Sequence, residues 1–234
     1  MDTDTPLNVD PAQPALQHLA SDQKRNIIRT VIVVVVFITS ILSLFVYRLN
    51  LPVVLSDEEL KKRGVFLFEK VRSFKDFSLL DHNNVQFTTE NLKGKWSMVF
   101  FGFTYCPDIC PTTMALLNRF YTKQLEGDFG SDLQVVMVSV DPARDTPEKL
   151  LDYVSFFNRE FIGVTGEFLE LHRFATQLNI PFKKVPGGGE NYQVEHSGNI
   201  AILNPQGHYV GFFRAPHEVS KLDLAYTSIR SSRN

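Results

Sequence analysis

The chain contains only two cysteines, and they lie close together in the segment FTYCPDICP, at Cys106 and Cys110. With no other thiol available, the chain has no network of structural disulfides, and both thiols follow a strongly apolar run. Two thiols in one short segment are typical of redox chemistry or of metal binding at sulfur. The sequence therefore indicates a reactive dithiol site rather than a scaffold held by disulfides.

The spacing of the two cysteines bears on which chemistry they perform. Residues four apart share one face of a helix, so a helical turn from Cys106 to Cys110 would bring both sulfurs to one point. Pro107 suits the first position of such a turn, and the positive end of the helix dipole favours thiolates. Dithiol redox sites usually place two residues between their cysteines. The wider spacing here suits chelation without excluding a disulfide, and chance burial of both thiols is the remaining alternative.

A third metal ligand has to come from elsewhere, because two thiolates alone form an incomplete site. His196 is favoured, since it directly precedes the strand-like segment Asn199–Leu203, which is expected beside the cysteine turn. Two thiolates and an imidazole suit three-coordinate Cu(I), whereas zinc usually takes a fourth ligand. The other histidines are expected on the surface: His18, His82, His172, His208 and His217.

Three further features near the cysteines each have a functional and an ordinary interpretation. Asp108 could orient a ligand or simply stand in the first turn of a helix. Asp141 ends a strand at the same edge, where turn formation is favoured. The glycine-rich loop 187–189 could let His196 swing in and out of the site, or it could be a plain connector.

Alternating strands and helices are expected to position these residues. Continuous apolar runs predict buried strands at Trp96–Phe103 and Leu133–Val140. Shorter strands are predicted at Phe77–Leu80, Val85–Phe87, Phe161–Val164, Asn199–Leu203 and His208–Phe213, and helices at Thr112–Leu125, 147–158, Glu167–Leu178 and Glu218–Ile229. This order predicts an α/β, thioredoxin-like fold with a central mixed sheet flanked by helices. The cysteine pair then lies at the carboxyl end of a central strand.

A membrane anchor is predicted near the N-terminus. The segment Val31–Tyr47 carries no charge, and at about 1.5 Å per residue it reaches roughly 26 Å, which nearby apolar residues extend to a bilayer span. No small-residue cleavage site follows, which favours an uncleaved helix over a signal peptide. Lys24, Arg25 and Arg29 precede the segment, whereas only Arg48 follows it closely. This charge bias predicts a cytoplasmic N-terminus and an extracytoplasmic C-terminal domain.

The chain as a whole divides into four predicted regions. These are a disordered tail (1–25), a transmembrane anchor (26–49), a linker (50–70) and a thioredoxin-like domain (71–234). The formal net charge of −2 gives no indication of nucleic-acid binding.

The cysteine segment Gly102–Thr113, GFTYCPDICPTT, resembles the signature of the Sco/SenC family of membrane-anchored copper metallochaperones. Val140–Glu148 and Glu195–Ser197 are similar to two further blocks of that family, which often has Asp where Glu195 stands. The resemblance covers about 74–230 in addition to the anchor.

This resemblance implies a thioredoxin-like fold and the binding of copper as Cu(I) or Cu(II). Carried over by position, the copper ligands would be Cys106, Cys110 and His196. The implied function is copper delivery to the binuclear copper site of cytochrome c oxidase during its assembly. The expected partners are the copper-receiving subunit of the oxidase, a thiol reductant and an upstream copper donor. The expected location is the inner (cytoplasmic) membrane, with the C-terminal domain in the periplasm.

Rival functions use the same thiols differently. A thiol-disulfide oxidoreductase acting on an exported protein or an oxidase subunit would use Cys106 as nucleophile and Cys110 as resolving thiol. A peroxidase is less favoured, because Phe103 stands where a threonine is expected, and a docking module would tolerate loss of both thiols. Enzymatic activity is therefore left open. His196 discriminates, since a chelator needs it and a redox enzyme has little use for it.

Overall fold

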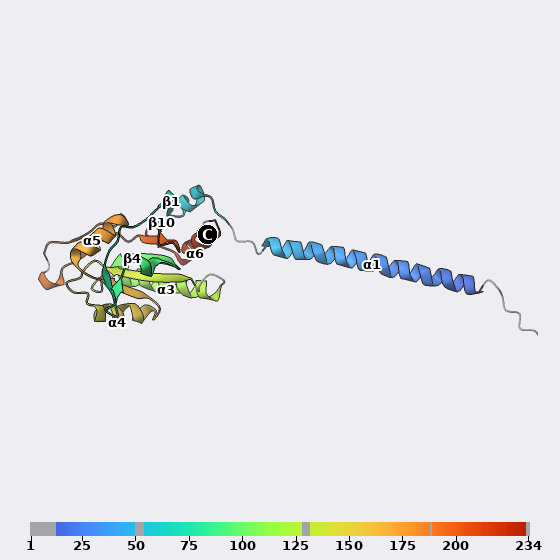
Figure 1. Cartoon of the computed structure of the whole chain (residues 1–234), viewed down its shortest axis with the longest axis horizontal. Coiled ribbons are helices and arrows are strands. Elements are labelled where there is room, and N and C mark those ends of the chain that lie inside the picture. Colours follow the sequence, from blue (N-terminus) through green and yellow to red (C-terminus); the bar gives the residue numbers. More distant parts are fainter. Residues whose placement is uncertain (1–12, 50–53, 128–131, 188, 233–234) are drawn as a thin grey trace, which may run out of the picture. The chain divides into compact units, whose positions relative to one another are not determined.

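The computed structural model of the chain describes residues 13–49, 54–127, 132–187 and 189–232, in two separate units divided after Pro52 (Figure 1). The first unit holds helix α1 (Gln13–Leu49), of which Gln23–Leu49 is long and apolar enough to cross a membrane. None of the residues in its most apolar window is buried. The tail predicted to be disordered at 1–25 is helical from Gln13 onward, where α1 begins. Residues 1–12 lie outside the described ranges.

The second unit is built around an eight-stranded mixed sheet with the order β1-β10-β9-β4-β5-β6-β2-β3. The strands are β1 (Val65–Arg72), β2 (Leu79–Asp81), β3 (Gln86–Phe87), β4 (Trp96–Gly102), β5 (Leu133–Ser139), β6 (Ile162–Thr165), β9 (Ile200–Leu203) and β10 (Tyr209–Phe213). A separate two-stranded sheet pairs β7 (Phe182–Lys184) with β8 (Val194–His196). The helices are α2 (Asp57–Lys62), α3 (Ile109–Glu126), α4 (Pro147–Phe157), α5 (Phe168–Gln177) and α6 (Val219–Ser232), with 3-10 turns η1 (Thr89–Leu92) and η2 (Gly189–Asn191).

The central strands confirm the predicted thioredoxin-like arrangement. Strands β4, β5 and β6 run parallel, whereas β9 and β10 are antiparallel to their neighbours. All residues of β4 and β5 are buried, as their continuous apolar runs predict for strands covered on both faces. Helix α4 begins at residue 147, as predicted: Thr146 caps it by accepting the backbone N–H of Lys149, and Pro147 occupies the first helical position.

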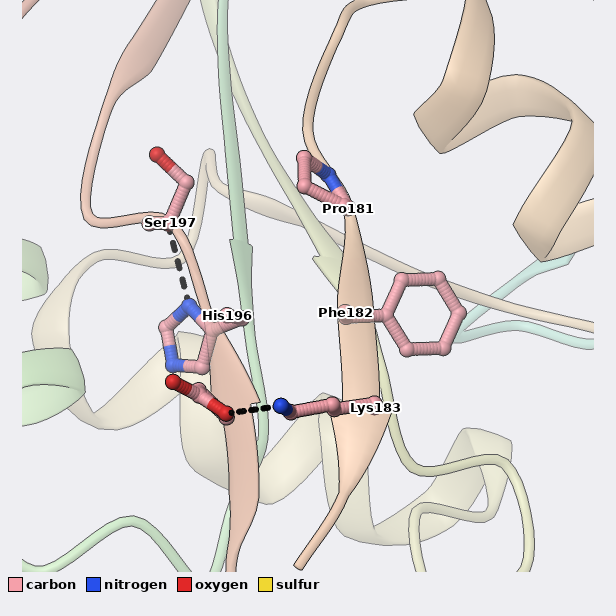
Figure 2. Close-up of a pocket in the computed structure, with 6 residues that line it drawn as sticks. Pro181, Phe182, Lys183, His196 and Ser197 are labelled. Atoms are coloured by element: carbon pink, nitrogen blue, oxygen red, sulfur yellow. Dashed lines mark hydrogen bonds and ion pairs between the residues drawn. The ribbon is translucent and has the colours of Figure 1, made fainter.

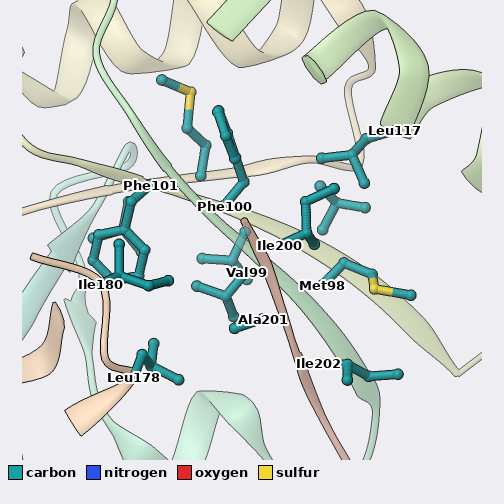
Figure 3. Packing of buried hydrophobic residues seen from close by; sticks show 14 of the residues in the cluster. Met98, Val99, Phe100, Phe101, Leu117, Leu178, Ile180, Ile200, Ala201 and Ile202 are labelled. Atoms are coloured by element: carbon teal, nitrogen blue, oxygen red, sulfur yellow. The ribbon is translucent and has the colours of Figure 1, made fainter. Parts of the chain in front are cut away.

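Side chains of β4 alternate between two helical layers, because successive residues of a strand point to opposite faces. Trp96 contacts Tyr226 of α6 on one face, and Phe101 contacts Phe174 of α5 on the other. Helix α3 contacts both α4 and α6, so these three helices share the first face. Figure 3 shows the centre of this core, where β4 and β9 side chains lie between residues from α3 and from the segment after α5.

The stretch 54–70, expected to be a linker, is more ordered than its charges indicate. It contains α2, which begins with a capping box at Ser56, and most of β1, whose Val65 pairs with Phe213 of β10. The apolar residues 65–68 provide the physical reason, since they add a strand to the edge of the sheet. The two strands predicted within 77–87 pair as the hairpin β2–β3, with Asn84 in the left-handed conformation at its turn (φ 62°).

His82, in that hairpin turn, ties the hairpin to the sheet. Its Nδ1 accepts a hydrogen bond from the backbone N–H of Gly163 in β6 at 2.9 Å. The pKa of His82 is lowered, chiefly because the ring is half-buried, and Asp81 opposes the shift. The neutral ring is the form that accepts this hydrogen bond.

We expect the free energy of unfolding to fall as the pH drops below about 6.5, because the unfolded His82 then binds a proton that the folded ring resists. His82→Asn offers a carboxamide oxygen in place of Nδ1 but does not titrate, so its stability should depend less on pH in this range. Urea unfolding at about pH 7.5 and about pH 5.5 measures the difference. An identical pH slope in both proteins would contradict the assignment.

Candidate metal centre

The cysteine segment forms the turn that joins β4 to α3. The backbone N–H of Cys106 donates to the Phe103 carbonyl at 3.2 Å, and this bond keeps Cys106 in the turn before the helix. Helix α3 begins at Ile109, so Pro107 does not occupy its first position, in contrast to the prediction. Asp108 stands at the N-cap position, is exposed, and makes no side-chain capping bond.

The two thiols differ in their surroundings although they lie together. Cys106 is half-buried, whereas Cys110 is 0% exposed, and both are free thiols. The backbone N–H of Cys110 points at the sulfur of Cys106, with N and Sγ 3.5 Å apart. Gly102 makes room for this arrangement, because a Cβ there would lie only 3.0 Å from Cys110 Sγ and 2.9 Å from Phe100.

His196 lies beside the two cysteines although it follows Cys110 by 86 residues in the sequence. It is the last residue of β8 and pairs with Phe182 of β7 in a small hairpin that sequence reasoning did not predict. Its Nε2 lies 3.4 Å from Cys110 Sγ. The Sγ atoms of Cys106 and Cys110 and a ring nitrogen of His196 all lie within 4.8 Å of one another. The structure thus brings together the three residues that the sequence singled out.

The tautomer of His196 follows from its neighbours. The ring nitrogen Nδ1 lies 3.1 Å from the carbonyl oxygen of Ser197, and this contact is drawn in Figure 2. A carbonyl oxygen only accepts, so Nδ1 carries the proton in the neutral ring and Nε2 keeps its lone pair. That lone pair faces the thiol of Cys110, which is the orientation a metal-binding imidazole needs.

The shared surroundings move the pKa values of the two thiols apart. A hydrogen bond from Cys110 lowers the pKa of Cys106 to about 5, against the opposing effect of burial, and backbone N–H groups add to the lowering. The same hydrogen bond and burial raise the pKa of Cys110. In the metal-free protein at pH 7, Cys106 is therefore a thiolate and Cys110 a thiol that donates its one proton to the Cys106 sulfur.

Arg144 joins the two segments that carry the candidate ligands. Its guanidinium stacks on the rings of Tyr105, which precedes Cys106, and Tyr192, which precedes β8. It also donates to Asp141 and to the Tyr192 carbonyl, at 2.5 and 2.9 Å. Asp141 therefore acts as a buried partner for Arg144 and for the Tyr192 hydroxyl, beyond ordinary turn formation.

This Arg144 network bears on the glycine-rich loop. Gly187 and Gly189 adopt positive φ angles, which glycine allows, and Tyr192 is anchored between them and His196. Tyr192 is therefore a fixed point between the loop and His196, which favours the plain-connector interpretation. Sequence reasoning missed the roles of Arg144 and Tyr192, because only their cation–aromatic contact in space reveals them.

A second buried carboxylate fixes the start of the cysteine turn. Asp145 is 0% exposed and accepts hydrogen bonds from the Thr104 hydroxyl and the Ser139 hydroxyl, both at 2.6 Å, and from the Thr104 backbone. Burial raises the pKa of Asp145, while these hydrogen bonds act in the opposite direction. Thr104 lies two residues before Cys106, so Asp145 holds the approach to the first thiol.

An open cleft of about 410 Å³ lies beside His196. Figure 2 shows His196 and Ser197 on one wall and Pro181, Phe182 and Lys183 on the other, with the Lys183–Glu195 ion pair between them. A partner protein can therefore approach the imidazole from solvent, while Cys110 stays enclosed.

Fold and site together define a thioredoxin-like domain that carries an accessible dithiol–imidazole centre. The profile of the SCO1/SenC family matches residues 69–227 of the chain. This chain belongs to the SCO1/SenC family.

Individual relatives agree with this assignment. A protein of Stutzerimonas stutzeri, named as copper-binding, is 40% identical over 170 residues, covering 73% of this chain and 83% of its own. Protein SCO1 homolog 1 of Arabidopsis thaliana, a mitochondrial protein, is 36% identical, and the match covers 67% of this chain but only 47% of that one. The chain thus spans about half the length of this mitochondrial relative.

Solved structures show the same fold. The crystal structure of Arabidopsis thaliana ScoI with copper bound has a TM-score of 0.63 and 34% identity, covering 67% of this chain and 98% of its own. Yeast Sco1 with copper bound has a TM-score of 0.62 and 30% identity, covering 70% and 90%.

Proposed function

We propose that this chain is a membrane-anchored copper carrier that holds copper, as Cu(I) or Cu(II), through Cys106, Cys110 and His196. The observation that carries the proposal is the convergence of two thiols and an imidazole within 4.8 Å at an accessible edge of the sheet. Soft thiolates with an imidazole suit copper better than hard cations. The copper-bound Sco structures of comparable fold support the same metal.

The order in which the ligands engage follows from their exposure and protonation. Cys106 is half-exposed and already a thiolate, so it makes the first contact with incoming copper. Cys110 then loses its proton, and His196 closes the site through the lone pair on Nε2. Release reverses this order, since a partner's ligands displace those of the carrier one at a time.

The partner and the location extend the same proposal. The copper-receiving subunit of cytochrome c oxidase takes the metal, with an upstream copper donor and a thiol reductant preparing the site. The anchor is 26–49 and lies in the inner (cytoplasmic) membrane. The basic residues before it favour a cytoplasmic N-terminus and a periplasmic domain at 71–234. Protease protection of the domain in spheroplasts, before and after the membrane is opened, tests this orientation.

Copper analysis of the reduced full-length protein in detergent tests the site. We expect copper to be retained by the unaltered chain and lost in Cys106→Ser and Cys110→Ser. His196→Ala should bind copper at least about tenfold more weakly and still form the Cys106–Cys110 disulfide on oxidation, because the bond forms between the two sulfur atoms and the imidazole is only their neighbour. His172→Ala, at an exposed position on α5, is the matched control.

Unaltered copper affinity in His196→Ala would reject the three-ligand site. Loss of both copper binding and disulfide formation in that variant would show instead that His196 supports the fold of the whole segment.

A thiol-disulfide oxidoreductase is a second candidate, favoured by the contrast between an accessible low-pKa Cys106 and an enclosed Cys110. The Cys106 thiolate would attack a partner disulfide and release one partner sulfur as a thiolate. Cys110, once its proton has passed to solvent, would attack the Cys106 sulfur and release the second partner thiolate. The carrier would be left oxidised and the partner reduced. Reduction of a model disulfide by the His196→Ala variant at the unaltered rate is the expected result for this activity.

A further inference from the structure

His217 lies far from the cysteines in sequence, yet it contacts the turn that follows His196. Its ring is half-buried just before α6, and its Nε2 lies 2.7 Å from the carbonyl oxygen of Gly198. Because a carbonyl only accepts, Nε2 carries a proton and donates this hydrogen bond. His217 was expected on the surface, and its partner in the turn is visible only in three dimensions.

Other contacts join the same two segments. The backbone N–H of Ala215 donates to the side-chain oxygen of Asn199 at 3.4 Å, and the Asn199 N–H donates to the Ser197 hydroxyl at 3.2 Å. A Cβ placed on Gly198 would lie 3.4 Å from the Ala215 side chain. The 215–217 segment therefore packs directly against the 197–199 turn.

The His196 ring packs edge-on against Phe100 and Phe103, and this turn supplies its polar contact. The ring is held by the Ser197 carbonyl, and the next carbonyl along the chain, that of Gly198, is the one that His217 fixes. On the other side, β8 is anchored through Tyr192 and Arg144. From that side the 197–199 turn receives two hydrogen bonds, and the His217 bond at 2.7 Å is shorter than the Ala215–Asn199 bond at 3.4 Å.

We propose that His217 is a positioning residue for His196. By fixing the Gly198 carbonyl, it holds the turn that presents the Ser197 carbonyl to Nδ1, and so keeps Nε2 directed at the thiols. This inference rests on the proposed copper site, because His196 is one of the proposed ligands and His217 is assigned the role of orienting it.

Two substitutions at His217 separate positioning from simple packing. His217→Gln keeps an amide N–H at about the reach of Nε2, whereas His217→Leu keeps bulk and removes the donor. Loss of groups that orient a metal ligand typically weakens metal binding about 10- to 100-fold. In full-length protein in detergent, we expect His217→Leu to weaken copper binding at least about tenfold and His217→Gln to stay close to the unaltered protein. His172→Leu serves as the exposed control.

A second arm places the effect at His196. When His196→Ala is the background, His217→Leu should cause no further loss of copper affinity, because the ligand it orients is already absent. A metal-free readout uses protein with 15N-labelled histidine. The His196 ring should show the Nδ1–H tautomer in the unaltered chain and in His217→Gln, and a mixture of tautomers in His217→Leu.

Equal copper affinity in His217→Leu, or the same loss in both backgrounds, would overturn the positioning role. An unchanged His196 tautomer in His217→Leu would overturn it as well. Failure of the copper site itself is recognised separately, since His196→Ala alone would then bind copper as tightly as the unaltered protein while the tautomer measurement still reports on positioning.

Discussion

Arg144→Ala should lower the free energy of unfolding of the domain by about 3 to 5 kcal/mol, the range for removing one partner of a buried ion pair. The side chains of Arg144 and Asp141 are only 14% and 4% exposed. Without the guanidinium, the buried carboxylate of Asp141 loses its positive partner. The Tyr192 carbonyl also loses a donor, and the rings of Tyr105 and Tyr192 lose the cation between them.

The single tryptophan makes this measurement direct. Trp96 is 0% exposed at the start of β4, so its fluorescence reports unfolding of the domain in urea. Arg173→Ala is the matched control, because Arg173 is 69% exposed in its pair with Glu170, and such surface pairs contribute at most about 1 kcal/mol. Similar small losses in both variants would show that the Arg144 network does not hold the two ligand segments together.

Most of the fold could be predicted because its central strands carry the strongest sequence signals. The buried strands β4 and β5 are long apolar runs, and α4 begins with a threonine cap and a proline, so their positions followed directly. Strand β1 was hidden because charged residues flank its short apolar stretch. The hairpin β7–β8 was hidden because strands of three residues have no periodicity to detect.

The candidate ligands of the site could be predicted because cysteine and histidine are recognisable as metal-binding residue types. Two cysteines and one well-placed histidine are rare enough to recognise, and the structure brings them together. The side chains that hold them are not recognisable in this way. Arg144 and His217 act through a stacked ring and a backbone carbonyl, and neither partner is identifiable before the chain is folded.

The different environments of the two thiols predict a large difference in reactivity. In the metal-free, reduced protein at about pH 6, iodoacetamide should modify Cys106 at least about 100-fold faster than Cys110. Cys106 is half-exposed, and its pKa of about 5 leaves it as a thiolate at that pH. Cys110 is fully enclosed and its pKa is raised, so it reacts only when the site opens. Mass spectrometry of tryptic peptides after timed quenching measures both rates in one sample.

The pH profile supplies the sharper test, because it separates ionisation from access. The rate at Cys106 should stay nearly constant from about pH 8 down to about pH 6 and fall to half near pH 5, where the thiolate takes up its proton. A low-pKa thiolate is also a weaker nucleophile, so its plateau rate should not exceed that of an ordinary thiolate. Cys110→Ala removes the donor beside Cys106 and should move the midpoint to higher pH. A midpoint that already lies near pH 8.5 in the unaltered protein would show that Cys110 does not stabilise the Cys106 thiolate, and that the first contact with copper requires loss of a proton.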